Sequence, residues 1–161
     1  MDKAKFWRLI QAAKKESDGD VEEQVAVLIE KLVSLPASEI IEFGSILDEL
    51  MARSYTNDLW AAAYIINGGC SDDCFDYFRG WLIAQGEQVF ESSLKAPETL
   101  VDVAEPDVEG ESMLYVAHRA YEEKTGKEMP RRERLAWELT GDKWDEDTVY
   151  DKYPKLAAKF A

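Results

Sequence analysis

Two thiols and two carboxylates lie within five residues of one another, in the run Cys70-Ser71-Asp72-Asp73-Cys74. Thiolates and carboxylates bind metal ions, and a thiol close to the start of a helix can have a lowered pKa. The run is therefore a candidate metal site through Cys70, Asp72, Asp73 and Cys74. Against this, the spacing is not that of a zinc finger, and the sequence contains no second cysteine pair.

The same run can also be purely structural. Ser71 is a good N-cap residue, and Asp72 and Asp73 after it would face the positive end of a helix dipole. Cys74 would then be a small core residue, and the use of only two cysteines, four residues apart, fits a reducing cytoplasm. We favour this interpretation because each residue has a local role, and we expect neither a metal nor another cofactor.

An enzyme with its site at this turn is the rival hypothesis. Asp72 and Asp73 would act as acid and base, Arg79 as an anion clamp and His118, the single histidine, as a proton shuttle. This hypothesis requires the turn to open into a pocket that faces His118. Arg79 can instead form an ordinary salt bridge with Asp76, three residues before it. The sequence has no Ser-His-Asp spacing, phosphate loop or dinucleotide fingerprint.

Aromatic side chains are dense in the same part of the chain and near the N-terminus. Tryptophan and tyrosine have polar tips that need partners, and they often line grooves. Trp7, Trp60 and Tyr77 are therefore candidates for the edge of a cleft. Arg79 belongs with them, because an arginine among aromatic residues can bind an anionic ligand or a partner carboxylate.

Helical spacing of apolar residues runs through almost the whole sequence, and neither an alternating strand pattern nor an internal repeat is present. Residues 67–82 predict a helix–turn–helix hinge at the centre of the fold, because Gly68 and Gly69 follow an apolar helix. We expect an irregular all-α bundle of several helices. Three of them should start after Asp2, Asp20 and Pro36. The others should lie near residues 59–66, 71–86, 87–94, 112–124, 131–139 and 144–160.

Length and composition predict a single domain over residues 1–161, with 46% hydrophobic residues to form its core. Within this domain, residues 97–111 contain two prolines and six acidic residues, and predict a long acidic surface connector. Residues 142–161 mix acidic with aromatic side chains. They predict a C-terminal segment that docks on the bundle.

The formal net charge of −14 limits the possible partners. A polyanion repels nucleic acid, and the densest basic cluster, Arg131, Arg132 and Arg134, is followed by acidic residues. The longest apolar run, residues 59–66, is too short to span a membrane, and the N-terminus lacks the pattern of a secretory signal. We expect a cytoplasmic protein that binds neither nucleic acid nor membrane, and the sequence leaves its oligomeric state open.

One long central string has an unusual composition. Residues 58–73 read DLWAAAYIINGGCSDD and continue into Phe75 and Tyr77-Phe78-Arg79-Gly80-Trp81-Leu82-Ile83. With Phe6-Trp7 upstream and Trp144-Asp145-Glu146-Asp147 in the tail, the string resembles the bacterial family of domains of unknown function DUF4240 over most of the chain. The resemblance implies no activity, substrate or catalytic residue.

Two functions from different classes are consistent with these patterns. The leading hypothesis is a non-enzymatic binding or regulatory module, like antitoxin or immunity proteins, whose acidic and aromatic surface engages a basic partner protein. The alternative is an enzyme or a metal-binding protein with its site between Cys70 and Arg79. Small size, negative charge and the missing catalytic motifs favour the first.

Overall fold

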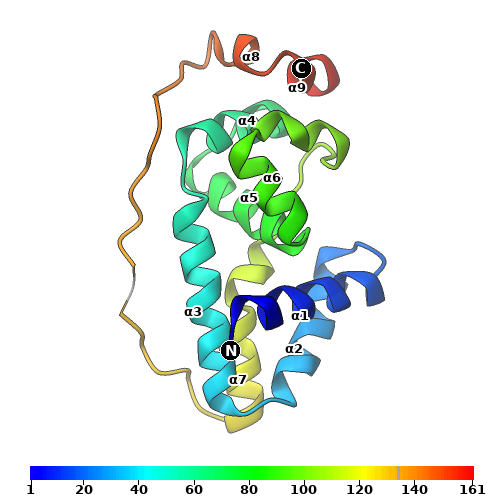
Figure 1. The fold of residues 1–161 in the computed structure, drawn as a ribbon, viewed down its shortest axis with the longest axis vertical. Coiled ribbons are helices and arrows are strands. Elements are labelled where there is room, and N and C mark those ends of the chain that lie inside the picture. The colour runs from blue at the N-terminus through cyan, green and yellow to red at the C-terminus, as the bar shows by residue number, and fades with distance from the viewer. Residues whose placement is uncertain (134) are drawn as a thin grey trace.

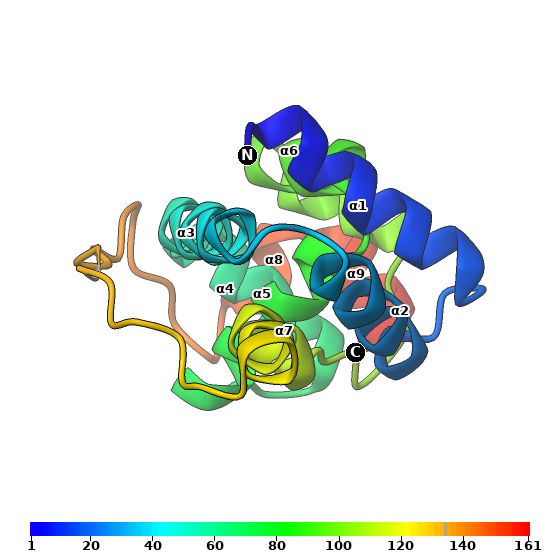
Figure 2. The ribbon, with the colours of Figure 1, turned by 90° about the horizontal axis from the view of Figure 1, so that it is seen from below.

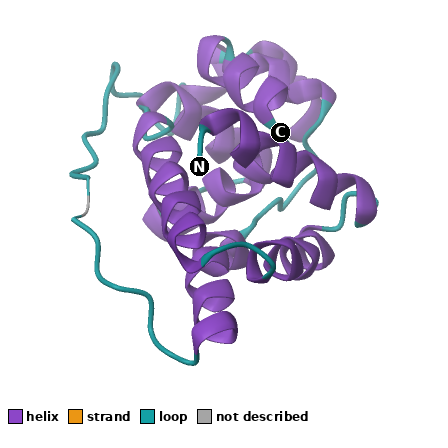
Figure 3. Cartoon of the chain, turned by 60° about the horizontal axis from the view of Figure 1, so that its bottom comes forward, coloured by secondary structure: helices purple, strands orange, loops and turns teal. Residues whose placement is uncertain are grey.

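The computed structural model describes residues 1–133 and 135–161. This part of the chain is helical, with no strand and with one isolated parallel bridge between Thr56 and Thr140 (Figures 1 and 3). The all-α prediction is confirmed. The α-helices are α1 (Lys3–Glu16), α2 (Val21–Val33), α3 (Ala37–Arg53), α4 (Asn57–Asn67), α5 (Asp72–Ala84), α6 (Glu87–Lys95), α7 (Val116–Thr125), α8 (Val149–Lys152) and α9 (Pro154–Phe160), and two 3₁₀ helices are η1 (Pro97–Asp102) and η2 (Glu111–Tyr115).

Four helices begin at a side chain that caps a free backbone N–H group. Asp2 accepts a hydrogen bond from the backbone of Lys5 at 2.8 Å, and Asp20, Thr56 and Ser71 do the same for α2, α4 and α5. Gly68 ends α4 with a φ of 65°, a left-handed conformation that glycine adopts without strain. Local sequence therefore sets the start of these helices and the turn between α4 and α5.

The core lies where the helices cross. Helix α7 packs against both α2 and α3, and α1 lies across α2 (Figures 1 and 2). In the predicted hinge, Phe78 and Trp81 are buried and Trp60 is half-buried. The prediction that residues 67–82 form a central helix–turn–helix is confirmed.

The acidic connector is more ordered than its composition suggested. Its first part is helix η1, which buries Leu100, and Ala104 is buried after it. Further along, Gly110 lies against Gly80 of α5 so closely that a Cβ on either residue would overlap the other's backbone. Only glycines permit this approach, which fixes the end of the connector to α5.

Two predictions about the C-terminal part were wrong. Residues 131–139 were expected to be a helix, but the residues described there are extended; we call residues 127–148 the strap. The strap joins α7 to α8 and runs alongside α3 (Figure 1). Tertiary contacts hold this segment along the bundle, because Arg132 binds α3 and Trp137 lies over Arg79 of α5. The single helix expected at residues 144–160 is two short helices, because Pro154 starts α9 anew.

Among the described residues, no helix is both long and apolar enough to cross a membrane.

Candidate partner-binding groove

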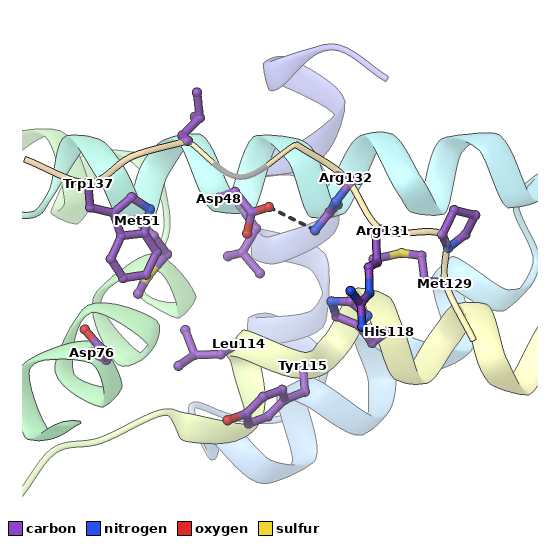
Figure 4. Close-up of a pocket in the computed structure, with 13 residues that line it drawn as sticks. Asp48, Met51, Asp76, Leu114, Tyr115, His118, Met129, Arg131, Arg132 and Trp137 are labelled. Atoms are coloured by element: carbon purple, nitrogen blue, oxygen red, sulfur yellow. Dashed lines mark hydrogen bonds and ion pairs between the residues drawn. The ribbon is translucent and has the colours of Figure 1, made fainter.

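A groove of about 880 Å³ lies between α3, the η2–α7 helices and the strap (Figure 4). Trp137 and Met51 lie towards one end of it, and His118 and Arg131 lie towards the other. The lining residues are Leu47, Asp48, Met51, Asp76, Leu114, Tyr115, His118, Met129, Pro130, Arg131, Arg132, Leu135 and Trp137.

The floor of the groove comes from α3, through Leu47 and Met51, which are buried and belong to the hydrophobic core. Leu47 and Met51 are one helical turn apart, so they lie on the same face, and Asp48 stands beside them. Tyr115 is 49% exposed and forms part of the wall on the η2 side. The groove therefore combines an apolar floor with an exposed aromatic side chain and a carboxylate.

Carboxylates gather just outside the groove, around Tyr77. The negative charge of Glu111 raises the pKa of Tyr77, and desolvation and the charge of Asp73 add to the effect. The arrangement follows from the glycine contact, because the Gly110 N–H donates to the Tyr77 carbonyl at 2.8 Å and holds the acidic connector against α5. Next to Tyr115, the surface is thus both aromatic and acidic.

Arg79 lies beneath the Trp137 end of the groove and is 0% exposed. Its guanidinium carbon lies 4.8 Å from the Tyr55 ring centre, 4.7 Å from that of Phe75 and 4.8 Å from that of Trp137. It donates to Asp76 at 2.5 Å and to the Met51 carbonyl. Burial lowers the pKa of Arg79, and the carboxylate of Asp76 opposes that effect.

Arg132 fixes the strap to α3. It donates to the Ile41 carbonyl at 3.0 Å and to Asp48 at 2.9 Å. Its guanidinium lies on Gly44, where a Cβ would overlap it. We call Ile41, Gly44 and Asp48 the arginine seat.

The predicted metal site does not form from free thiols. Cys70 and Cys74 are joined by a disulfide, which corrects the expectation of reduced cysteines and removes the argument that they gave for a reducing cytoplasm. Cys74 is half-buried rather than in the core. In the described part of the chain, no three His, Cys, Asp or Glu residues are placed to hold a metal ion.

The structure separates the predicted catalytic residues. Asp72 and Asp73 are exposed in the first turn of α5, behind the Ser71 cap, and they are not among the groove residues. His118 is exposed and lines the groove. The carboxylate that α5 contributes to the same lining is that of Asp76. The expected ion pair between Arg79 and Asp76 is present, but Arg79 is buried rather than on the surface.

The predicted binding surface is also divided. Trp7 lies in the core, 5.2 Å from Phe6 between ring centres, so it edges no groove. Trp60 is half-buried, stacks on Phe75 at 4.8 Å and donates from its indole to the Cys70 carbonyl at 2.9 Å. Tyr77 is partly exposed beside the carboxylates of Glu111 and Asp73.

Sequence reasoning did not find Asp48, Arg132 or Trp137 as site residues. One signal was present, since Gly44 interrupts an otherwise strong helical pattern in α3. A glycine in a helix interior costs about 1 kcal/mol relative to alanine, so its presence indicates a close approach by another group. The identity of that group, a side chain from 88 residues further along the chain, could not be derived.

The helices form a small all-α domain with a groove on its surface. The chain belongs to the family of proteins of unknown function DUF4240, whose family model matches residues 1–123. No curated protein and no solved structure shows significant similarity to it. The match includes all of α3 and α5 and most of α7. It leaves out the strap, α8 and α9, and with them the tail residues 144–147 and 153–156, which the resemblance had included.

Proposed function

We propose that this protein is a binding module that takes up an extended, basic segment of a partner protein in the groove along α3. Antitoxin and immunity proteins, the classes that the sequence suggested, act by binding a partner in this general manner. The proposal concerns recognition, and no step of chemistry is part of it.

The observation that carries the proposal is the arginine seat. Helix α3 already holds an arginine of an extended segment through the carboxylate of Asp48, the carbonyl of Ile41, and a glycine that makes room for it. Charged hydrogen bonds of this kind are stronger than neutral ones and specific for guanidinium geometry. The surface is therefore suited to basic extended chains.

Charge and shape support the same partner. A net charge of −14 attracts a basic protein, and the carboxylates around Tyr77 add negative charge just outside the groove. Tyr115, exposed on the wall, is a residue type that dominates interface energies when a partner covers it. Leu135, which is 52% exposed in the lining of the groove, gives such a partner a further apolar side chain to bury.

Affinity capture from a native lysate tests the proposal when groove variants are compared. We expect the wild type to recover a basic protein in stoichiometric amount, with binding that weakens as salt rises. Tyr115→Ala combined with Glu111→Gln should reduce recovery about ten-fold or more, since one aromatic hot spot alone contributes at least about 2 kcal/mol. Val103→Ala, at an exposed apolar residue outside the groove, is the matched control.

Two results would contradict the proposal. One is that no protein is recovered in stoichiometric amount. The other is that the Tyr115 and Glu111 variant and the Val103 control recover the partner equally, which would place the contact elsewhere on the surface.

A further inference from the structure

The strap meets the bundle at several points, including one on each of α3, α5 and α4. The first is the arginine seat, which holds Arg132. The second is a surface of two rings and a guanidinium, from Tyr55, Phe75 and Arg79, that Trp137 covers; we call these three residues the tryptophan seat. Both seats consist of residues within the part of the chain that the family model matches.

The third point uses only the backbone of the strap. The Thr140 carbonyl accepts from the Asn57 N–H at 2.8 Å, and the Asn57 side chain donates to the Gly141 carbonyl at 2.9 Å. The first of these bonds, together with the bond from the Thr140 N–H to the Tyr55 carbonyl at 3.4 Å, forms the parallel bridge between Thr56 and Thr140. Contacts to backbone groups do not recognise a side chain, so the arginine and tryptophan seats provide the sequence preference.

Between these points the strap is loosely packed. The groove of about 880 Å³ lies on one side of it, and a second hollow of about 410 Å³ lies on the other. Leu135 is 52% exposed and Trp137, although seated, is 39% exposed. Little apolar area is buried by this stretch, so its removal from α3 exposes little new apolar surface on the strap itself.

We propose that the two seats are a peptide-binding site, and that the strap is an internal stand-in for a partner segment. The partner segment is extended and carries an arginine followed five residues later by an aromatic residue, the spacing of Arg132 and Trp137. This inference rests on the proposed function and specifies its partner. The partner segment binds by replacing the strap, which joins the groove and the second hollow into one site.

Attachment to the same chain makes the strap a strong competitor. A tethered segment acts at an effective concentration in the millimolar range, so a free peptide competes poorly with an intact strap. The test therefore uses the full-length Arg132→Ala/Trp137→Ala variant, in which the strap has lost the two side chains that occupy the seats but the seats are unchanged. The probe is a fluorescent peptide with the sequence of residues 128–142, and fluorescence anisotropy measures its binding.

We expect the peptide to bind this variant about ten-fold or more tightly than it binds the wild type. Adding Gly44→Ala to the variant should weaken binding, because the new Cβ overlaps the position of the guanidinium and forces it to shift. A peptide with alanine in place of its arginine and tryptophan should not bind. Circular dichroism melts of all variants serve as the control that the bundle remains folded in each.

The inference is overturned if the peptide fails to bind the Arg132→Ala/Trp137→Ala variant or binds it no more tightly than it binds the wild type. It is also overturned if Gly44→Ala leaves the affinity for the peptide unchanged. These results are distinguishable from a failure of the proposed function. If a lysate partner still depends on Tyr115 while the peptide does not bind, the groove binds partners and the strap is not their stand-in. If the peptide binds while no lysate partner is recovered, the seats are a peptide site and the proposed function loses its support.

Discussion

The bundle and the strap are held in place by different kinds of contact. In the bundle, large side chains such as Phe43 and Phe78 are fully buried, and capped helices cross one another around them. The described residues of the strap are extended and mostly exposed. They meet the bundle through a few side chains, which include Met129, Arg132, Trp137 and Trp144, and through a few backbone hydrogen bonds. Loss of one strap contact should therefore leave the bundle intact, whereas loss of one core side chain should weaken the whole domain.

The largest effect is expected in the core. Phe78→Ala should lower the free energy of unfolding by about 3–5 kcal/mol, because it removes buried apolar surface and leaves a cavity. Leu135→Ala, at an exposed strap position, should change it by about 0.5 kcal/mol or less. Urea denaturation measures both. Similar losses in the two variants would remove the distinction between bundle and strap.

Arg79 sharpens the comparison, because this buried residue of the bundle contacts Trp137 of the strap. Arg79→Ala should cost about 3 kcal/mol, since it empties a buried site and leaves the Met51 carbonyl without its charged donor. The matched control is Arg53→Ala, since Arg53 also pairs with one carboxylate, Glu91 at 2.9 Å, and lies over one ring, Phe90. That pair is solvent-exposed, so its loss should cost about 1 kcal/mol or less. Equal losses in the free energy of unfolding would mean that burial does not increase the contribution of Arg79 to stability.

The disulfide should have an intermediate effect. Reduction of Cys70–Cys74 should lower the free energy of unfolding by up to about 2 kcal/mol, the loop-closure value for so short a loop. The Cys70→Ser/Cys74→Ser variant should show the same loss and no further response to reductant. A thiol titration of the untreated protein that finds two free thiols would contradict the disulfide itself.

Tyr153 tests how α9 is docked. Desolvation raises the pKa of Tyr153, and the nearby carboxylates of Asp58 and Glu98 raise it further. The folded state therefore keeps the phenol proton after the unfolded state has lost it. The stabilisation by this group is intact below the ordinary tyrosine pKa of about 10 and falls as pH rises above that value.

Tyr153→Phe should accordingly cost about 1 kcal/mol or less near neutral pH, where the hydroxyl donates to the Asp58 carbonyl at 3.2 Å. Above about pH 10 the wild type should lose stability faster than the variant. Denaturation curves for both proteins across this range measure the difference. Parallel loss of stability in the two proteins would mean that the pKa of Tyr153 does not differ between the folded and unfolded states.

The same contrast explains what the sequence could reveal. The helices of the bundle were predictable because caps such as Asp20 and Ser71 and the periodic apolar residues act locally. The extended form of residues 131–139 was not, because it depends on contacts with α3 and α5 that are distant in sequence. Arg79 was recognised as the partner of Asp76, but its burial depends on Tyr55, Phe75 and Trp137, which the tertiary fold brings together.

The most direct test of the account is Gly44→Ala, because it acts on the arginine seat alone. Trypsin cleavage after Arg131 and Arg132, followed by mass spectrometry, should be about ten-fold faster or more, while the free energy of unfolding stays unchanged or rises by up to about 1 kcal/mol from the better helix former. Ser38→Ala, an exposed substitution in the same helix, should change neither quantity. Cleavage that stays at the wild-type rate, or a bundle that loses stability together with the strap, would contradict the claim that the strap is separately held on a peptide-binding surface.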